Sequence, residues 1–507
     1  MGLSARPAGG GRGRGLHAVS RAQEVVAKTK GKFEEAVGER FLAGLYLTVP
    51  HYGTKRGTTF LRGQWTQGVQ VYSYRKDARE AIKHYERASE LLLALNATAK
   101  DLKAKVTTER IELDFDLATA LSGDGQYGYR YARWGRPFWW WWGEGLEAEE
   151  DSEAMEEADY EETRWGWGGG WGENQPPPIG IPLGPDGKPQ FIQVPGQYSS
   201  NLSSGQKIRF LLEEVQRLDA STNRNDAARA LFRWAMIART LYGPDSTSGY
   251  SSAQVRYDRF GQPLPAQADP DEPKKKIWEL ADDEAITLVG GKLRVVTLPP
   301  PESPIALLRE LERKYPSSEL CPEAQYTSAL YVQTRQQFPK AVKQYEAFLE
   351  AYPKHKRAHD AREQLQRIAQ SDVILGQSGV YLPDARPKLS FSYRNADTVE
   401  LKALNLDLVK YVQDSLELTP TNGWWEYRNF QYYFFQNDRW KKYVGAEAQR
   451  WNENVPRPSG NCVAEGSTAA PLTEPGAYLV EAAVPGKERP VESLPTWWRV
   501  RKMILTH

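Results

Sequence analysis

The sequence is poor in the residues that build covalent and metal-bound frameworks. Its 507 residues include two cysteines, Cys321 and Cys462, and six histidines. Two cysteines cannot form a disulfide framework, and a structural zinc site takes about four Cys and His ligands together. We therefore expect neither a disulfide-stabilised fold nor a bound metal or other cofactor.

Long apolar runs are also missing. No stretch approaches the ~18 apolar residues that cross a bilayer, so no membrane span is expected. The opening, Met1–Leu16, is rich in Arg and Gly and lacks the apolar core of a signal peptide. It looks like translated upstream sequence, so the start of an exported protein could have been lost through a misplaced initiation site. Its Gly9–Gly15 stretch resembles an RNA-binding Arg-Gly tract, but one short instance is better interpreted as a flexible start.

Neither sign of charge is in excess. Lys and Arg number 66 against 65 Asp and Glu, a formal net charge of +1, which disfavours a dedicated nucleic-acid binder. The sequence contains no Gly-x-Ser-x-Gly, P-loop or dinucleotide fingerprint. We therefore do not expect an enzyme, and we assign no catalytic or cofactor-binding residues.

Length and composition predict several domains. At roughly 150 residues per domain, the chain corresponds to about three. Changes in composition divide it further into a disordered basic start, a helical region, a low-complexity insertion, a helical pair with a β-hairpin, a helical repeat and a β domain. These segments are 1–18, 19–122, 123–200, 201–300, 301–372 and 373–507.

Helical periodicity characterises two of these segments. In Lys76–Leu95 apolar residues recur at spacings of three and four, after a break near Pro50–Gly63. Gly205–Leu241 contains two such stretches joined by a short polar link, which predicts an antiparallel pair of helices. Ala285–Leu298 has β-branched runs on both sides of Gly290-Gly291 and predicts a hairpin.

The insertion at 123–200 has no regular hydrophobic period. Phe138–Trp142 reads FWWWW, an acidic stretch runs from Glu144 to Glu162, and a Pro run follows Gln175. We interpret the segment as a disordered or weakly ordered surface loop. The alternative is an aromatic stretch that binds sugar or a protein partner, because Trp offers a large amphipathic contact surface.

An internal repeat begins after Pro301. Tyr315-Pro316 aligns with Tyr352-Pro353, and Ala324 aligns with Ala361. Small residues that let two helices approach, aromatic residues between them and a Pro after each pair resemble the tetratricopeptide family, although its Trp-x-x-Leu-Gly opening is missing. The resemblance implies paired helices that offer a concave surface to a protein partner. The alternative is a spacer whose helices only pack on each other.

After Ile368 the hydrophobic period changes from 3.6 to 2. Lys388–Asn395 and Thr398–Leu408 alternate apolar with polar residues and are separated by a short turn, which predicts a hairpin. Gly476–Val484 and Thr496–Thr506 supply further strands. Strands separated by Pro and Gly turns predict a β-sandwich, so the expected fold is multi-domain, helical repeats followed by a sandwich.

Two motifs of this β domain resemble the N-terminal macroglobulin-like domain of bacterial alpha-2-macroglobulins. A Tyr393-Arg394-Asn395 turn precedes a Val-Glu-Leu-Lys strand, and Pro475-Gly476 opens a Pro-Gly-x-Tyr-x-Val strand. Bacterial members also place helical repeats ahead of this domain. The resemblance implies a periplasmic or extracellular protein that takes part in trapping or inhibiting proteases. The alternative is a tetratricopeptide-type adaptor for other envelope proteins.

The chemistry of that family does not carry over. Its thioester requires a Cys followed two residues on by Glu-Gln, and neither Cys321 nor Cys462 has that neighbour. No bait region is identifiable. We therefore expect the N-terminal portion of a larger macroglobulin array, from a truncated or a split gene.

Two sets of residues remain as candidates for contact or metal binding. His355 and His359 share a helix face, but Lys356 between them and the lack of a third ligand favour exposed histidines over a zinc site. Four tryptophans exceed what one modest sandwich core usually holds, so we expect some of them to contact a partner or a missing domain. They are Trp424, Trp425, Trp497 and Trp498.

Overall fold

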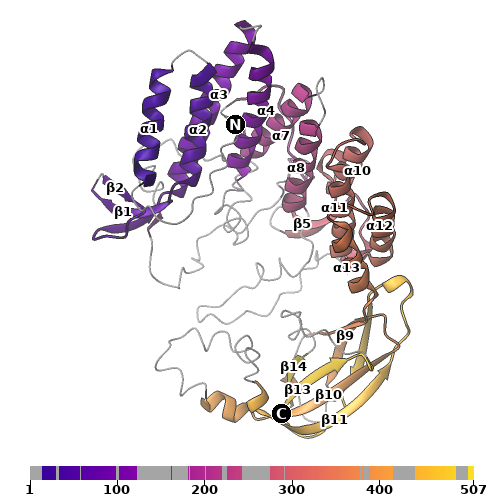
Figure 1. Ribbon diagram of the computed structural model, residues 1–507. Coiled ribbons are helices and arrows are strands. Elements are labelled where there is room, and N and C mark those ends of the chain that lie inside the picture. The colour runs from indigo at the N-terminus through magenta and orange to yellow at the C-terminus, as the bar shows by residue number, and fades with distance from the viewer. Residues whose placement is uncertain are drawn as a thin grey trace. The chain divides into compact units, whose positions relative to one another are not determined.

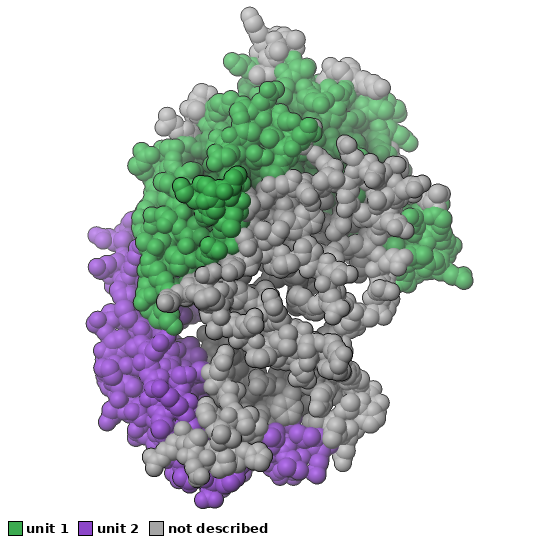
Figure 2. Space-filling view, turned by 180° about the vertical axis from the view of Figure 1, so that it is seen from behind, with its two compact units in different colours: residues 1–328 green, residues 329–507 purple. Residues whose placement is uncertain are grey.

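The computed structural model describes residues 14–29, 33–57, 59–98, 102–122, 161–162, 181, 183–199, 201–219, 225–242, 275–289, 292–376, 380–381, 387–414, 440–486 and 501–506 (Figure 1). The chain divides into two compact units, Met1–Ser328 and Ala329–His507 (Figure 2). Helices predominate in the N-terminal half and strands in the C-terminal part, which confirms the predicted order of α before β. Within the described ranges, no helix is long and apolar enough to cross a membrane.

The helices of the first unit are α1 (Arg14–Lys28), α2 (Phe33–Thr48), α3 (Tyr74–Thr98), α4 (Lys103–Ser122), α7 (Ser204–Leu218), α8 (Asn225–Tyr242) and α10 (Pro304–Lys314). From α1 to α4 each helix packs on the next, and α7 then packs on α4, α8 on α7 and α10 on α8. Their apolar faces share one core, in which Leu92, Phe115 and Ile208 are almost completely buried. The apolar faces that the periodic spacing predicts are therefore buried in the structure.

Side-chain caps define the packed pair α7 and α8. Ser203 accepts a hydrogen bond from the backbone N–H of Gln206, whose side chain accepts one from the backbone of Ser203, a capping box. At the other end of α7, Asp219 Oδ2 accepts a hydrogen bond from the backbone N–H of Ala227 at 2.9 Å. The Asp219 side chain thus bridges the short polar link predicted between the two helices. It also accepts a hydrogen bond from one of the first backbone N–H groups of α8, which have no partner within the helix.

The predicted helical region 19–122 is interrupted by strands. β1 (Tyr52–Arg56), β2 (Thr59–Arg62) and β3 (Val69–Tyr72) form an antiparallel sheet in the order β2-β1-β3, and β4 (Glu161–Glu162) pairs with the outer edge of β3. Gly57, at φ +55°, follows β1 in its turn to β2. The break expected at Pro50–Gly63 is therefore a folded element, and its short strands have too few alternations to show in the sequence.

The insertion predicted at 123–200 packs in part on the helices. Its Trp/Gly and acidic stretches lie outside the described residues apart from β4, so the interpretation of those stretches as a loop stays a prediction. Ile181 and Ile192, however, are buried in the core of the first unit, and the Tyr198 hydroxyl donates to Glu86 Oε1 of α3 at 2.6 Å. Ile181, Ile192 and Tyr198 therefore pack on the helices, and the Pro and Gly residues around them hide these few contacts in the sequence.

The predicted hairpin at Ala285–Leu298 is confirmed. β5 (Glu284–Val289) and β6 (Lys292–Thr297) pair antiparallel. The Gly290-Gly291 turn itself lies outside the described residues. A short 3-10 helix, η4 (Ile277–Glu279), precedes the hairpin, and another, η5 (Pro300–Glu302), leads into α10, whose Ser303 N-cap accepts from the backbone N–H of Ala306.

Three further helices are α11 (Cys321–Thr334), α12 (Phe338–Ala351) and α13 (Ala358–Ala369). α10 and α12 end in the same way: Tyr315 has φ −128° and ψ 54°, and Tyr352 has φ −132° and ψ 56°. Each of these tyrosines donates its backbone N–H to the carbonyl oxygen four residues earlier. Ala324 and Ala361, which the sequence also aligns, are both fully buried.

The strands of the second unit are β7 (Asp372–Leu375), β8 (Val380–Tyr381), β9 (Lys388–Arg394), β10 (Thr398–Leu406), β11 (Val444–Asn454), β12 (Ala464–Ala469), β13 (Gly476–Ala483) and β14 (Arg501–Thr506). They form one sheet in the order β11-β10-β13-β14-β8 and another in the order β12-β9-β7. One apolar core contains buried residues of both sheets, such as Phe391 of β9 and Leu401 of β10.

The predicted hairpin of Lys388–Asn395 with Thr398–Leu408 is wrong. β9 pairs with β12 and β7, whereas β10 pairs with β11 and β13. The turn between β9 and β10 therefore carries the chain from one sheet to the other. An alternating sequence cannot distinguish two strands that pair in one sheet from two strands that belong to different sheets. In both arrangements the apolar residues alternate with period 2.

Candidate functional site

The residues predicted to contact a partner are not placed. Trp424, Trp425, Trp497 and Trp498 all lie outside the described residues. Their role stays a prediction.

Neither cysteine is paired with the other. Cys321 is buried at the start of α11, and its Sγ donates to the carbonyl oxygen of Tyr315 at 2.9 Å. Burial raises the pKa of this thiol above its ordinary value, which disfavours the reactive thiolate. Cys462 is partly buried in the second unit. The structure gives Cys321 a packing role next to a helix end.

The two histidines of α13 and the loop before it do not form a metal site. His359 is 79% exposed and lies 3.8 Å from Glu363, whereas the ring of His355 packs edge-on against Phe348. Across the part of the chain that is described, no group of three or more His, Cys, Asp or Glu residues is positioned to hold a metal ion.

A buried cluster that the sequence did not reveal brings together His51, Ser73 and Asp77. His51 Nδ1 lies 2.8 Å from Asp77 Oδ2, and the Ser73 hydroxyl donates to the same oxygen at 2.8 Å. Arg62 donates to both carboxylate oxygens, at 2.5 and 2.6 Å. These residue types also occur in hydrolase triads, but here the serine and the histidine both bind the carboxylate instead of each other, and His51 Nε2 lies 3.2 Å from the carbonyl oxygen of Leu47.

The electrostatics of this cluster fit a structural role. Burial of Asp77 opposes its ionisation, but the hydrogen bonds from His51 and Arg62 outweigh burial and hold its pKa below the ordinary value. Asp77 lies in the first turn of α3, His51 immediately precedes β1, and Arg62 is the last residue of β2. The ionised carboxylate therefore ties the small sheet to the helices.

A second buried carboxylate lies where η5 joins α7 and α8. Glu302 is 2% exposed, and Arg209 Nη1 lies 3.8 Å from its Oε1. Arg209 also donates to the carbonyl oxygen of Pro301 at 2.8 Å, and its guanidinium lies over the ring of Trp234. Burial raises the pKa of Glu302 to about 7, although Arg209 opposes the rise.

The best candidate for partner binding is a polar face formed by α2, α4 and α8 of the first unit. Arg40 of α2 reaches two carboxylates of α4, with its Nη1 2.9 Å from Glu109 and its Nε 2.7 Å from Asp116. Arg229 of α8 lies 3.3 Å from Glu112 of α4. Basic, acidic and basic side chains therefore alternate across three helices.

These ion pairs are held in place by packing and by one another. Arg229 stacks its guanidinium 3.8 Å from the ring centroid of Phe115, and Glu112 also lies 3.8 Å from Arg40. All of these ionic side chains keep part of their surface in solvent. A network of this kind fixes side-chain positions without a large desolvation cost.

Apolar side chains are exposed beside this network on α2. Val37 and Phe41 are one turn apart, and they are 37% and 62% exposed. Arg40 lies between them in the sequence, at the border between this exposed side of the helix and the buried side that Ala36, Leu42 and Ala43 mark. We refer to Val37, Phe41 and the ion pairs of Arg40 and Arg229 as the α2–α4–α8 face.

A further arrangement joins α13 to the sheets inside the second unit. Asn395, in the turn after β9, has φ +54°, and its Nδ2 donates to the carbonyl oxygens of Ile368 and Gln370 at 2.9 and 3.1 Å. The neighbouring Arg394 donates to the carbonyl oxygens of Arg367 and Ile368. The Tyr-Arg-Asn turn thus satisfies the C-terminal carbonyl groups of α13.

The same turn also reaches α12. The Arg394 guanidinium lies over the ring of Phe338, 4.4 Å from its centroid. Gly460, at φ +65°, approaches Pro339 so closely that a Cβ atom would meet its ring at 3.0 Å. Contacts from two loops of the β domain therefore hold the helix pair.

Comparison with known proteins gives no family assignment. No protein-family model matches the chain, and no curated protein matches it.

Proposed function

We propose that the chain is a non-catalytic protein-binding scaffold, a tetratricopeptide-like helical array followed by a macroglobulin-like β-sandwich. Packing of consecutive helices supports the array, and the core shared by two sheets supports the sandwich. From the sequence resemblance we infer that it is the N-terminal portion of an alpha-2-macroglobulin-like protein that takes part in protease trapping or inhibition in the periplasm or outside the cell.

One observation carries the proposal of protein binding. Phe41 keeps 62% of its surface exposed beside the ordered ion pairs of Arg40. Aromatic side chains and Arg are enriched in the energetically important centres of protein interfaces, and polar groups surround them. The α2–α4–α8 face has this composition.

The proposal is tested with purified endopeptidases of different catalytic classes. The full chain should co-elute with at least one of them in size-exclusion chromatography and slow its cleavage of a protein substrate. Phe41→Ala should reduce co-elution, whereas Leu93→Ala, which removes another exposed apolar side chain of the first unit, should not. Co-elution that is equal for the two variants, or absent for every protease, would contradict the proposal.

The alternative is a tetratricopeptide-type adaptor that binds another envelope protein. The α2–α4–α8 face also favours this role, because it belongs to the helices alone. An adaptor should leave all proteases active and unbound. A chain without residues 373–507 should then keep its partner, whereas an inhibitor fragment should need the β domain to bind a protease.

A further inference from the structure

β4 adds a strand to the small sheet from a distant part of the sequence. Glu161 and Glu162 pair antiparallel with Tyr72 and Val71 of β3, about ninety residues away by sequence number. Only two residues pair, so few backbone hydrogen bonds hold β4 in place. At the other end of β3, Val69 remains 50% exposed.

The two partners have opposite charge. Residues 50–79, which contain β1–β3 and the start of α3, include six Lys or Arg and one acidic residue, Asp77. Asp77 is buried in its contacts with His51 and Arg62, so it contributes little negative charge to the surface. Residues 144–162 contain eleven Asp or Glu and no Lys or Arg.

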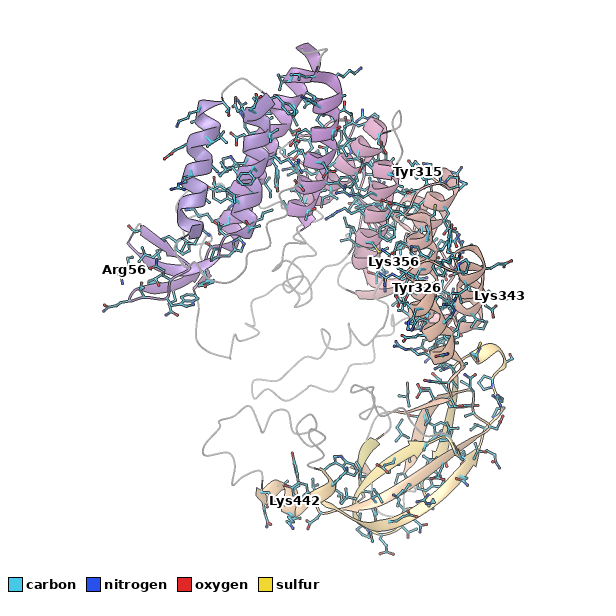
Figure 3. The ribbon with its side chains drawn as sticks, viewed as in Figure 1. Arg56, Tyr315, Tyr326, Lys343, Lys356 and Lys442 are labelled. Carbon is cyan, nitrogen blue, oxygen red and sulfur yellow. The ribbon has the colours of Figure 1, made fainter. Side chains whose placement is uncertain are left out.

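Two of the basic residues lie at the end of β3 from which the acidic segment approaches. Arg56 is exposed at the tip of the β1–β2 hairpin (Figure 3), and Lys55 lies opposite Val69 at the start of β3, so both lie at the end of the strand farther from Glu161. Arg75 and Lys76 fall in the first turn of α3, where the helix dipole also favours negative charge. Since β4 is antiparallel to β3, its N-terminal residue, Glu161, pairs at the end of β3 next to this turn.

We propose that the outer edge of β3 is a strand-addition site for an extended acidic segment, and that the acidic segment of this chain ending in β4 is its displaceable occupant. Main-chain hydrogen bonds of strand pairing and attraction between the acidic segment and the basic residues both contribute to the affinity. This site lies apart from the residues of the α2–α4–α8 face, so the proposal does not depend on the function assigned to that face.

The test uses a fluorescent synthetic peptide with the sequence of residues 146–162. It is titrated into the full chain and into the double variant Glu161→Pro/Glu162→Pro, in which β4 cannot pair. The peptide should bind the double variant at least about tenfold more tightly, because its intramolecular competitor has been removed. Equal affinity for the two proteins, or no binding to either, would overturn the proposal.

Three controls separate strand addition from general attraction between charges. A peptide of equal charge with Pro at the two β4 positions should bind at least about tenfold more weakly. Arg75→Gln/Lys76→Gln, added to the double variant, should also weaken binding, and raising ionic strength from about 0.05 to about 0.5 M should do the same. Binding that is unaffected by the Pro residues or by the Gln substitutions would contradict strand addition at this site.

A measurement without peptide checks the intramolecular contact. Hydrogen exchange at Tyr72, whose backbone N–H faces β4, should be faster in Glu161→Pro/Glu162→Pro than in the unaltered chain, while exchange at Val71, which faces β1, and in α4 should not change. Unaltered exchange at Tyr72 would show that β4 does not occupy the edge.

Discussion

Asn395 caps helix α13 from a different structural element. Its side-chain amide donates to the carbonyl oxygen of Ile368 at 2.9 Å, across a separation of 27 residues. The Ser371 hydroxyl donates in return to the carbonyl oxygen of Asn395 at 2.8 Å. Because Asn tolerates positive φ better than most residues, one residue both turns the chain between two sheets and holds the end of a helix.

Asn395→Ala should therefore destabilise the second unit by roughly 2–4 kcal/mol, since it leaves buried carbonyl groups without a donor and places Ala at positive φ. Asn395→Gly relieves the backbone strain and should cost only about 1–2 kcal/mol. Urea denaturation measures both variants. Equal stability of Asn395→Ala and the unaltered chain would show that the cap is unimportant.

The cluster around Asp77 should dominate the stability of the small sheet. Asp77→Asn removes the charge that Arg62 and His51 bind and should cost about 3–5 kcal/mol, since it leaves a partly buried guanidinium without its counter-ion. The control is Glu80→Gln at the exposed Glu80–Lys83 pair, which should change stability by less than about 0.5 kcal/mol. Similar unfolding free energies for the two variants would argue against this role of Asp77.

Two buried carboxylates, Glu302 and Asp114 of α4, should make the first unit more stable in mild acid. Burial raises the pKa of Glu302, and that of Asp114, to about 7, above their values in the unfolded chain. The folded state therefore retains protons that the unfolded state loses. The free energy of unfolding should fall as pH rises from about 4.5 to about 7, with a slope of up to about 1.4 kcal/mol per pH unit for each group.

Titration of unfolding between pH 5 and pH 8, a range chosen from the pKa values of about 7, tests this dependence. Asp77 does not affect this range, because its depressed pKa makes its contribution disappear only at lower pH. Glu302→Gln and Asp114→Asn should each flatten the slope. A slope of opposite sign, or slopes that these substitutions leave unchanged, would contradict the assignment.

The aligned alanines should respond alike to enlargement. Ala324 and Ala361 are fully buried, so replacement of either by Leu should cost about 1–3 kcal/mol through overpacking. Ala347 of α12 is exposed, and Ala347→Leu should change stability by no more than about 0.5 kcal/mol. Thermal unfolding measures the three variants. If Leu is tolerated at only one of the two buried positions, the environments of Ala324 and Ala361 are not equivalent.

Local periodicity predicted the helices, the β5–β6 hairpin and four of the eight described strands of the second unit, β9, β10, β13 and β14, because each of these elements buries a face within one continuous stretch. Contacts between residues far apart in the sequence leave no periodic pattern of apolar residues. Nothing adjacent to Asp77 in the sequence indicates that Arg62 and His51 meet it, and the alternation of β9 does not show which sheet it joins. The packing of Ile181 and Ile192 was hidden for the same reason.

The α2–α4–α8 face was also predicted only in part from the sequence. The sequence predicted paired helices with a partner-binding surface, but it could not identify Phe41 as exposed, because an aromatic residue on an amphipathic helix is usually buried. Only the packing of α2 on its neighbours shows that Val37 and Phe41 lie on the solvent side.

Isothermal titration of active-site-blocked endopeptidases into the full chain, Phe41→Ala and Leu93→Ala tests protein binding by the α2–α4–α8 face most directly. The account predicts saturable binding of at least one protease, weakened about tenfold or more by Phe41→Ala and within about twofold of the unaltered value for Leu93→Ala. Binding that Phe41→Ala leaves unchanged, or no binding by any protease, would contradict it.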